Sequence, residues 1–550
     1  MKRKILPILL LLVLVVGGVF TYKYIKHTND ALPKTITDKE TKKVKSTPIV
    51  PKYKPIPING PTLWQQEAES LSSYPSDLDQ ISENVANFKR YDNKLYGYSF
   101  DFPADWIIDR HQVPFYTRLF NDNFRIDITV QNVQKAWTSP TGYISETLDS
   151  VTPYITSNKK WSRNSFQIQN VNYERPVIAG IENDMNYYSY YFITKGSNVY
   201  TFQLKSNAAE YQNRRLDLEK IINSFSTHSP INIDLNGKIK TEIQSNDLTL
   251  KHNKKSLSIP KNTFMMGLYT PASYDIDKLE ASIQQKIGLQ MFYKAINSAY
   301  DPYTKELVDK NRVPIITFLY QEENSKDNKE VVRNIINGQY DIQLKEWANQ
   351  IRKTGAPVLV RLGNEMNGKW SEWSYINNYN DPDLYKLSFT HIVNVFKEAG
   401  ASNAYFIWNP NHVSSPYYQW NEPAMYYPGD KVVDFVGMTS YNFGKSKWHG
   451  YETFEELYDE MYWEYSRSYY KKPLLIGEIG AVEEGGNKAE WITQMFNDLP
   501  TKYPNIKMVV WFDGVHPPFD LRVNTSPASL LAFQTGMNTQ YVIKKIQPTK

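Results

Sequence analysis

The chain contains no cysteine among its 550 residues. Disulfides, thiolate metal sites, a cysteine nucleophile and lipoprotein-type attachment are therefore excluded. The formal net charge is only +5, from 63 basic and 58 acidic side chains, so the chain lacks the concentrated positive charge of a nucleic-acid-binding protein. It also lacks regularly spaced histidines and carboxylates and a phosphate-binding glycine loop. We therefore expect no metal and no cofactor.

Aromatic residues, in contrast, are plentiful. The chain has 41 tyrosines and 13 tryptophans, which suit sugar binding because pyranose faces stack on aromatic rings. A strand-rich protein also uses tyrosine for packing, so most of these residues are equally compatible with a structural role. The length exceeds that of one ordinary domain and predicts two or three units with connectors.

The first 27 residues predict a membrane segment. Lys2, Arg3 and Lys4 precede an apolar run from Ile5 to about Tyr22, which approaches the length of a membrane span. Because no small-residue cleavage site follows, we expect an uncleaved anchor with a cytoplasmic N-terminus and an exported remainder. The alternative is a cleaved signal and a secreted protein.

Residues 28–88 are expected to form a linker and short helices. Up to about Gly60 the segment is rich in Lys, Thr and Pro and predicts an extended tether. Thr62–Phe88 then carries apolar residues at helical spacing. A second polar connector, residues 229–243, predicts that the parts before and after it fold independently of one another.

Residues 89–228 predict a separate α+β unit. Strands are expected at Phe124–Val133, Met185–Gly196 and Val199–Ser206, with a hairpin joining the last two, and a helix at Tyr211–Phe225. The opening YGYSFDFPADW, the antiparallel strands and the final helix resemble a PsbP-like domain, over about residues 91–228. The unit contains no acid pair, so we expect a spacer or binding role without catalysis.

Residues 244–545 alternate apolar runs with helical patterns, which predicts an α/β fold of the (β/α)8 TIM-barrel type. The runs are short and rich in β-branched residues, as strands buried on both faces require. The expected strands are Phe264–Leu268, Leu289–Tyr293, Val313–Phe318, Pro357–Arg361, Tyr405–Trp408, Phe435–Thr439, Leu474–Gly477 and Met508–Phe512.

Two of these strands end in a carboxylate. Glu365 follows the fourth strand in the segment RLGNEMNGKWSEW, and Glu478 follows the seventh in LLIGEIGA. In such barrels the catalytic groups lie at the C-terminal ends of the strands. Paired carboxylates at that face suggest glycoside hydrolysis, in which a separation of about 5–5.5 Å marks a retaining mechanism.

The motifs that contain these acids resemble glycoside hydrolase family 26. The resemblance begins with INGQYD and RLGNEMNGKWSEW in Ile336–Trp373 and covers roughly residues 244–545. It continues, in the same order, through WNPN, YYPGDKVVDFVGMTSYN, IGEIG and DLRVNTSPASLLAF. The resemblance implies that Glu365 is the acid/base and Glu478 the nucleophile of a retaining glycosidase.

Further substrate-binding residues are implied around this pair. Tyr441 is expected to hydrogen-bond the nucleophile, and Arg361 either balances the two acids or pairs with a structural carboxylate. Asn364 stands where many mannanases of this family have histidine, and an asparagine there can bind a sugar 2-hydroxyl. Sugar platforms are expected from four tryptophans, any of which could instead pack in the core: Trp370, Trp373, Trp408 and Trp511.

The sequence thus predicts an enzyme that cleaves β-linked polysaccharide outside the cytoplasm, most simply an endo-β-1,4-mannanase. Asn364 keeps a β-1,3/1,4-glucanase or a xylanase open as alternatives. The rival from another class is a non-catalytic polysaccharide-binding protein, which would have no need of the acid pair. The expected partners are a polysaccharide and, through the N-terminal segment, a membrane.

Overall fold

The computed structural model describes residues 78–549, except residue 86 and the segments 110–114, 179–180, 182–183, 234–245, 272–275, 326–327 and 446–449. The predicted membrane segment at 1–27, the linker up to residue 77 and most of the connector 229–243 lie outside the described residues. Within the described part, every helix is too short or too polar to cross a membrane.

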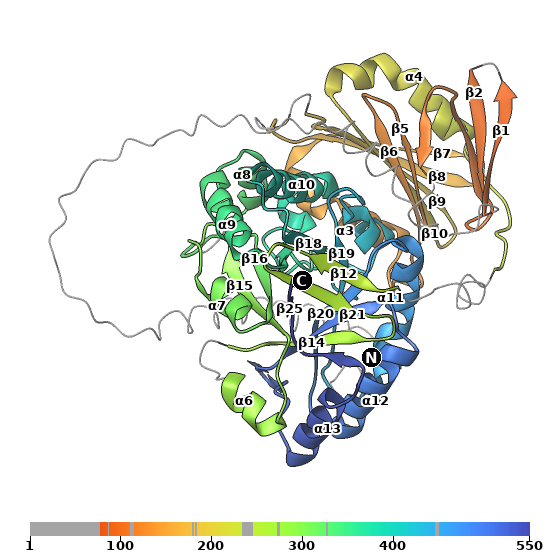
Figure 1. The fold of residues 1–550 in the computed structure, drawn as a ribbon. Coiled ribbons are helices and arrows are strands. Elements are labelled where there is room, and N and C mark those ends of the chain that lie inside the picture. Colours follow the sequence, from red (N-terminus) through yellow and green to blue (C-terminus); the bar gives the residue numbers. More distant parts are fainter. Residues whose placement is uncertain are drawn as a thin grey trace.

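The first unit consists of two antiparallel sheets with helices α3 (Pro140–Leu148) and α4 (Ala208–Ser224), and it lies beside the barrel (Figure 1). The predicted final helix and the hairpin at Gly196 are present. One sheet has the order β1-β2-β3-β11 and the other β4-β5-β6-β10-β9-β8-β7. Their strands are β1 (Asp79–Val85), β2 (Phe88–Asn93), β3 (Tyr98–Pro103), β4 (Ile107–Asp109), β5 (Tyr116–Phe120), β6 (Arg125–Asn132), β7 (Ile155–Arg163), β8 (Phe166–Glu174), β9 (Tyr187–Lys195), β10 (Asn198–Ser206) and β11 (Ser226–Thr227).

The start of this unit corrects one expectation. Helices were predicted within Thr62–Phe88, but Asp79–Val85 forms strand β1, which pairs antiparallel with β2. The apolar spacing of Leu78, Ile81 and Val85 fits a helix, but the local preference for a helix is weak. Pairing with β2 supplies backbone hydrogen bonds, and these outweigh that preference. The likeness to PsbP-like domains stays a prediction.

The second unit is the predicted closed barrel of parallel strands with helices outside (Figure 1). The strands follow chain order, and β14 pairs with both β15 and β21, which closes the barrel. All the expected strands are present. They are β14 (Phe264–Tyr269), β15 (Leu289–Ala295), β16 (Val313–Leu319), β17 (Val358–Leu362), β18 (Ala404–Trp408), β19 (Phe435–Asn442), β20 (Leu474–Ala481) and β21 (Ile506–Phe512).

The outer layer contains α6 (Ile276–Ile283), α7 (Tyr303–Asp309), α8 (Val331–Ile336), α9 (Asp341–Thr354), α10 (Pro382–Glu398), α11 (Phe454–Ser468), α12 (Lys488–Thr501) and α13 (Pro527–Met537). A small sheet of β12 (Leu248–Lys251), β13 (Lys255–Ile259) and β25 (Gln547–Pro548) covers one end of the barrel. The backbone N–H groups of Lys254 and Lys255 donate to the carbonyl of Gly355, just before β17. That end is therefore opposite the one where Glu365 lies.

A buried ion-pair network joins the first unit to the start of α10. Lys205 Nζ lies 2.8 Å from Asp381 Oδ2 and 2.9 Å from Asp383 Oδ2. Arg125 Nη1 donates to Asp383 Oδ1 at 3.0 Å, and the Tyr188 hydroxyl donates to Asp381 Oδ2 at 2.5 Å. Removing one member would leave the remaining buried charges less well compensated and so destabilise this junction.

Aromatic side chains form an apolar part of the same interface. Tyr375, Tyr418 and Trp420 of the barrel belong to one core cluster with residues of the first unit, including Tyr143 and Tyr188. A barrel cut free at residue 244 would expose these rings and lose the ion pairs. The independence of the two units expected from the polar connector is therefore not what the structure supports.

Candidate active site

Glu478 lies in β20, and its carboxylate receives hydrogen bonds from side chains of three other barrel strands. Arg361 Nη2 donates to Oε1 at 2.5 Å, the Tyr293 hydroxyl donates to Oε1 at 2.6 Å, and the Tyr441 hydroxyl donates to Oε2. These donors stabilise negative charge on the carboxylate. The site therefore suits a glutamate that reacts in its ionised form.

The backbone around Glu478 is irregular. The pairing of β20 shifts register between Met438 and Thr439 on one side, and between Ile476 and Ile479 on the other. Such bulges redirect a side chain. Gly477 is required here because a Cβ would lie 1.8 Å from Asn409 Oδ1 and 2.9 Å from Arg361 Nη1. The glycine before the acid thus makes room for the two groups behind it.

Arg361 connects the strands beneath the two acids. It is fully buried, and besides Glu478 it donates from Nε to Thr317 Oγ1 at 2.9 Å and from Nη1 to Asn409 Oδ1 at 3.2 Å. Burial lowers the pKa of Arg361, but Glu478, Tyr293 and Glu365 together outweigh it and the net shift is upward. Of the two roles left open by the sequence, pairing with the catalytic-site acid is the one observed.

Glu365 follows β17 and has a different environment. Its φ is +57°, a conformation that non-glycine residues rarely adopt and that clusters at functional sites. Its backbone N–H donates to the carbonyl of Asn409 at 2.8 Å, and Trp370 Nε1 donates to its Oε2 at 2.9 Å. Burial, followed by the negative charge of Glu478, raises the pKa of Glu365 to about 7, while hydrogen bonds from Asn411 and Trp370 oppose the shift.

Aromatic rings surround Glu478, including three that the sequence did not single out. The ring of Tyr269 lies 5.0 Å from that of Tyr293 and 4.6 Å from that of Phe512, and Phe512 lies 6.0 Å from Tyr441. Tyr269, Tyr293 and Phe512 all lie at or near the C-terminal ends of barrel strands. That position was the signal that could have identified them.

Two predicted sugar platforms are instead parts of the barrel wall. Trp511 is fully buried, donates from Nε1 to the Leu521 carbonyl at 2.7 Å and packs on Trp491 of α12. Trp408 is also fully buried and packs on Tyr427 and Tyr469. Successive strand residues point to opposite faces, so Asn409 and Phe512, one position further along, contact the site instead.

The other predicted residues surround Glu365. Trp370 is partly exposed beside its carboxylate, as expected for a residue that borders substrate. Trp373 is buried and donates from Nε1 to the Asn364 carbonyl at 2.8 Å, so it positions the segment rather than offering a free face. Asn364 is buried, and its side-chain oxygen has no hydrogen-bond partner among the described residues. A substrate hydroxyl would supply one.

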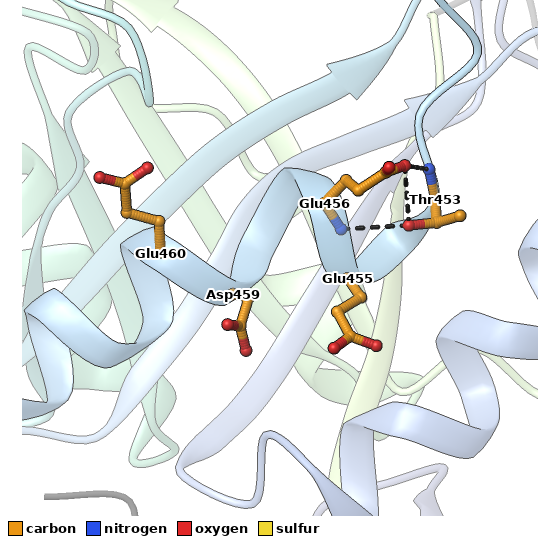
Figure 2. A pocket seen from close by; sticks show the side chains of 5 residues that line it. All are labelled: Thr453, Glu455, Glu456, Asp459 and Glu460. Carbon is orange, nitrogen blue, oxygen red and sulfur yellow. Dashed lines mark hydrogen bonds between the residues drawn. The ribbon is translucent and has the colours of Figure 1, made fainter. Parts of the chain in front are cut away.

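An open hollow of about 500 Å3 lies beside the start of α11. Figure 2 shows the five side chains that line it: Thr453, Glu455, Glu456, Asp459 and Glu460. Thr453 Oγ1 accepts from the Glu456 N–H at 3.1 Å, and the Glu456 side chain accepts from the Thr453 N–H at 2.7 Å. This capping box explains the local sequence as a helix start.

Within the described ranges, no cluster of His, Cys, Asp and Glu is arranged to hold a metal.

A closed parallel barrel with two carboxylates at the C-terminal ends of its fourth and seventh strands is the arrangement of the (β/α)8 glycosidases. Residues 309–481, which contain both acids, match the model of glycosyl hydrolase family 26. This part of the chain is therefore similar to that family.

Three relatives illustrate the range of the match. Endoglucanase H of Acetivibrio thermocellus is 29% identical over 260 residues, which cover 45% of this chain and 27% of that protein. The β-1,3-xylanase TXYA of a Vibrio species is 30% identical over 151 residues, 27% of this chain and 28% of that one. A mannan endo-1,4-β-mannosidase of Bacillus subtilis is 26% identical over 177 residues, 31% and 43% respectively. The chain thus spans less than half the length of each relative.

Proposed function

We propose that this chain is a retaining glycoside hydrolase that cleaves β-linked polysaccharide at internal bonds. The observation that carries the proposal is the contrast between two neighbouring acids. Glu478 accepts hydrogen bonds from Arg361 and two tyrosines, whereas Glu365 is partly buried, accepts from one indole and has a pKa raised to about 7. A binding protein has no need of such a pair, and a retaining glycosidase requires one.

The proposed roles follow from these environments. Glu478, ionised and held by Arg361, Tyr293 and Tyr441, attacks the anomeric carbon and forms a glycosyl-enzyme. Glu365, protonated near neutral pH, gives its proton to the departing glycosidic oxygen. It then removes a proton from the incoming water, which releases the sugar with its original configuration. Asn364 binds the sugar 2-hydroxyl beside the reacting carbon.

The first candidate substrate is β-1,4-mannan, as the family and the Bacillus subtilis relative suggest. β-Glucan is the second candidate, because the Acetivibrio thermocellus relative is called an endoglucanase and its match covers 45% of this chain. The Vibrio relative keeps xylan open in the same way. Asn364 stands where many mannanases of this family have histidine, which is a reason to test substrates other than mannan.

Product analysis of the full chain on soluble mannans, mixed-linkage β-glucans and xylans tests the proposal. We expect oligosaccharides of several lengths to appear early, as internal cleavage requires, and proton NMR to show the β-anomer first. Binding of a polysaccharide without any hydrolysis would favour the non-catalytic rival. Initial release of the α-anomer would contradict the retaining mechanism.

We also propose that the enzyme acts outside the cytoplasm while anchored to the membrane. The support is the basic start Lys2–Lys4, followed by the apolar run to about Tyr22. Fractionation tests this directly, because the anchored form should pellet with membranes and keep its first residues. Secreted material that begins beyond Lys26 would indicate a cleaved signal instead.

A further inference from the structure

Helix α3 of the first unit borders the segment that carries Glu365. Trp370 donates to Glu365, and the residue before it is Lys369. Burial lowers the pKa of Lys369, and the nearby Glu146 carboxylate of α3 partly opposes this shift. The Tyr418 hydroxyl of the barrel donates to Glu146 Oε2 at 2.5 Å. The segment that follows the proposed acid/base therefore lies within electrostatic range of α3, and Tyr418 of the barrel contacts α3 directly.

The same contacts reach the turn before α3. The ring of Tyr418 lies 4.8 Å from that of Tyr143 in α3, and Gln131 Oε1 accepts the Gln419 N–H at 2.9 Å. Burial and Glu146 raise the pKa of Tyr418, and a hydrogen bond with Thr138 opposes this rise. Thr138 therefore lies beside Tyr418 at the barrel loop, and the residue before it is Trp137.

Trp137 is presented to solvent in an unusual way. Its side chain is 88% exposed, the largest exposed fraction among the large apolar residues of the described chain. Its φ is +52°, although an aromatic residue in this conformation costs stability relative to glycine. Tyr417, next to Tyr418, is 56% exposed. An exposed indole held in a strained turn suggests a binding role, because neither feature improves folding.

We infer that Trp137 of the first unit is a sugar platform that extends the active site on the leaving-group side. The inference rests on the proposed function. The acid/base protonates the oxygen of the leaving group, so the surface that continues outward from the Glu365 segment faces that part of the substrate. The ligand is the leaving-group end of a β-linked polysaccharide chain, stacked on the indole face and helped by Tyr417. The first unit is then part of the substrate-binding surface.

The test compares Trp137→Ala with the full-length wild type on two kinds of substrate. The first is soluble β-1,4-mannan or mixed-linkage β-glucan. The second is a 2,4-dinitrophenyl glycoside of the same sugars, which has no sugar on the leaving-group side. We expect kcat/KM on the polymer to fall roughly 2- to 10-fold, the worth of one aromatic stacking contact. Activity on the aryl glycoside should not change.

Two further variants separate binding from folding. Trp161→Ala, which removes a 39% exposed tryptophan that packs on Tyr191 in the other core of the same unit, should leave both activities unchanged. Trp137→Gly should lose polymer activity as Trp137→Ala does while keeping or raising the melting temperature, because glycine relieves the positive φ.

The outcomes are distinct. Equal polymer activity of Trp137→Ala and wild type, or equal losses on polymer and aryl glycoside, would overturn the platform and leave the proposed function intact. A wild type that hydrolyses neither substrate would instead contradict the proposed function itself.

Discussion

Glu365 and Glu478 are the same side chain in two different settings, close enough for the charge of Glu478 to raise the pKa of Glu365. Glu478 sits within a strand and accepts from a buried arginine and two tyrosines. Glu365 lies in the segment after a strand, with a strained backbone and an indole donor, and burial together with the charge of Glu478 raises its pKa. Arg361 donates a hydrogen bond to Glu478, while at Glu365 its charge only partly opposes the rise in pKa. Burial and the charge of Glu478 therefore separate two otherwise identical acids.

The comparison predicts its largest effect at Glu478. Glu478→Ala removes the proposed nucleophile, so we expect kcat to fall at least about 10⁴-fold on every substrate, activated or not. Added azide should restore some turnover and give a glycosyl azide with inverted configuration, as proton NMR would show. A product with retained configuration would mean that the two roles are exchanged.

Glu365→Ala should lose activity selectively. On polysaccharide we expect a fall of about 10²- to 10⁴-fold, because the leaving group departs without a proton. On a dinitrophenyl glycoside the first step should be spared, since that leaving group needs no acid. Azide should then give a product with retained configuration. Equal losses on both substrates would remove the distinction between the acids.

Replacing Arg361 tests how far this cation accounts for the difference between the two acids. Arg361→Lys keeps the charge but loses the fixed fork that reaches Glu478, Thr317 and Asn409 together. We expect kcat to fall roughly 10- to 100-fold, in line with the loss of hydrogen bonds to a charged group. Arg361→Met should in addition unfold at lower temperature, because it leaves a buried carboxylate unpaired. Unchanged kinetics in Arg361→Lys would show that charge alone suffices.

Asn364 tests the sugar side of the same site. Its buried oxygen lacks a partner among the described residues, so binding of the sugar should satisfy it, and most fully in the transition state. Asn364→Ala should lower kcat about 5- to 10-fold with little change in KM. A higher KM with an unchanged kcat would place Asn364 outside the subsite that holds the reacting sugar.

The smallest expected effect is a shift in pH dependence. Glu365 is the proposed acid and its pKa is raised to about 7, so kcat/KM of the wild type should fall as pH rises through that value. The Trp370 indole lowers this pKa, so Trp370→Phe should raise it and move the alkaline limb of the profile to higher pH. A limb that stays in place or moves to lower pH would exclude this hydrogen bond as a determinant.

The sequence by itself determined the barrel and its acids. Short apolar runs such as Leu474–Ile476, alternating with helical patterns, are typical of strands buried on both faces, and their count and order predict a closed parallel sheet. A carboxylate directly after such a run must lie at the mouth of the barrel. Glu365 and Glu478 were therefore identified from local pattern together with the family motifs, before any contact was known.

Only the tertiary structure decided which side chains near the acids face the site and which contacts join the first unit to the barrel. A shift of one position along a strand moves a side chain from the mouth to the wall, which is why Trp408 and Trp511 are buried while Phe512 faces the site. The ion pairs of Lys205 with Asp381 and Asp383 join residues about 180 positions apart, a separation that local patterning does not encode. Contacts between distant segments decided these features, because burial and charge pairing depend on what the fold brings together.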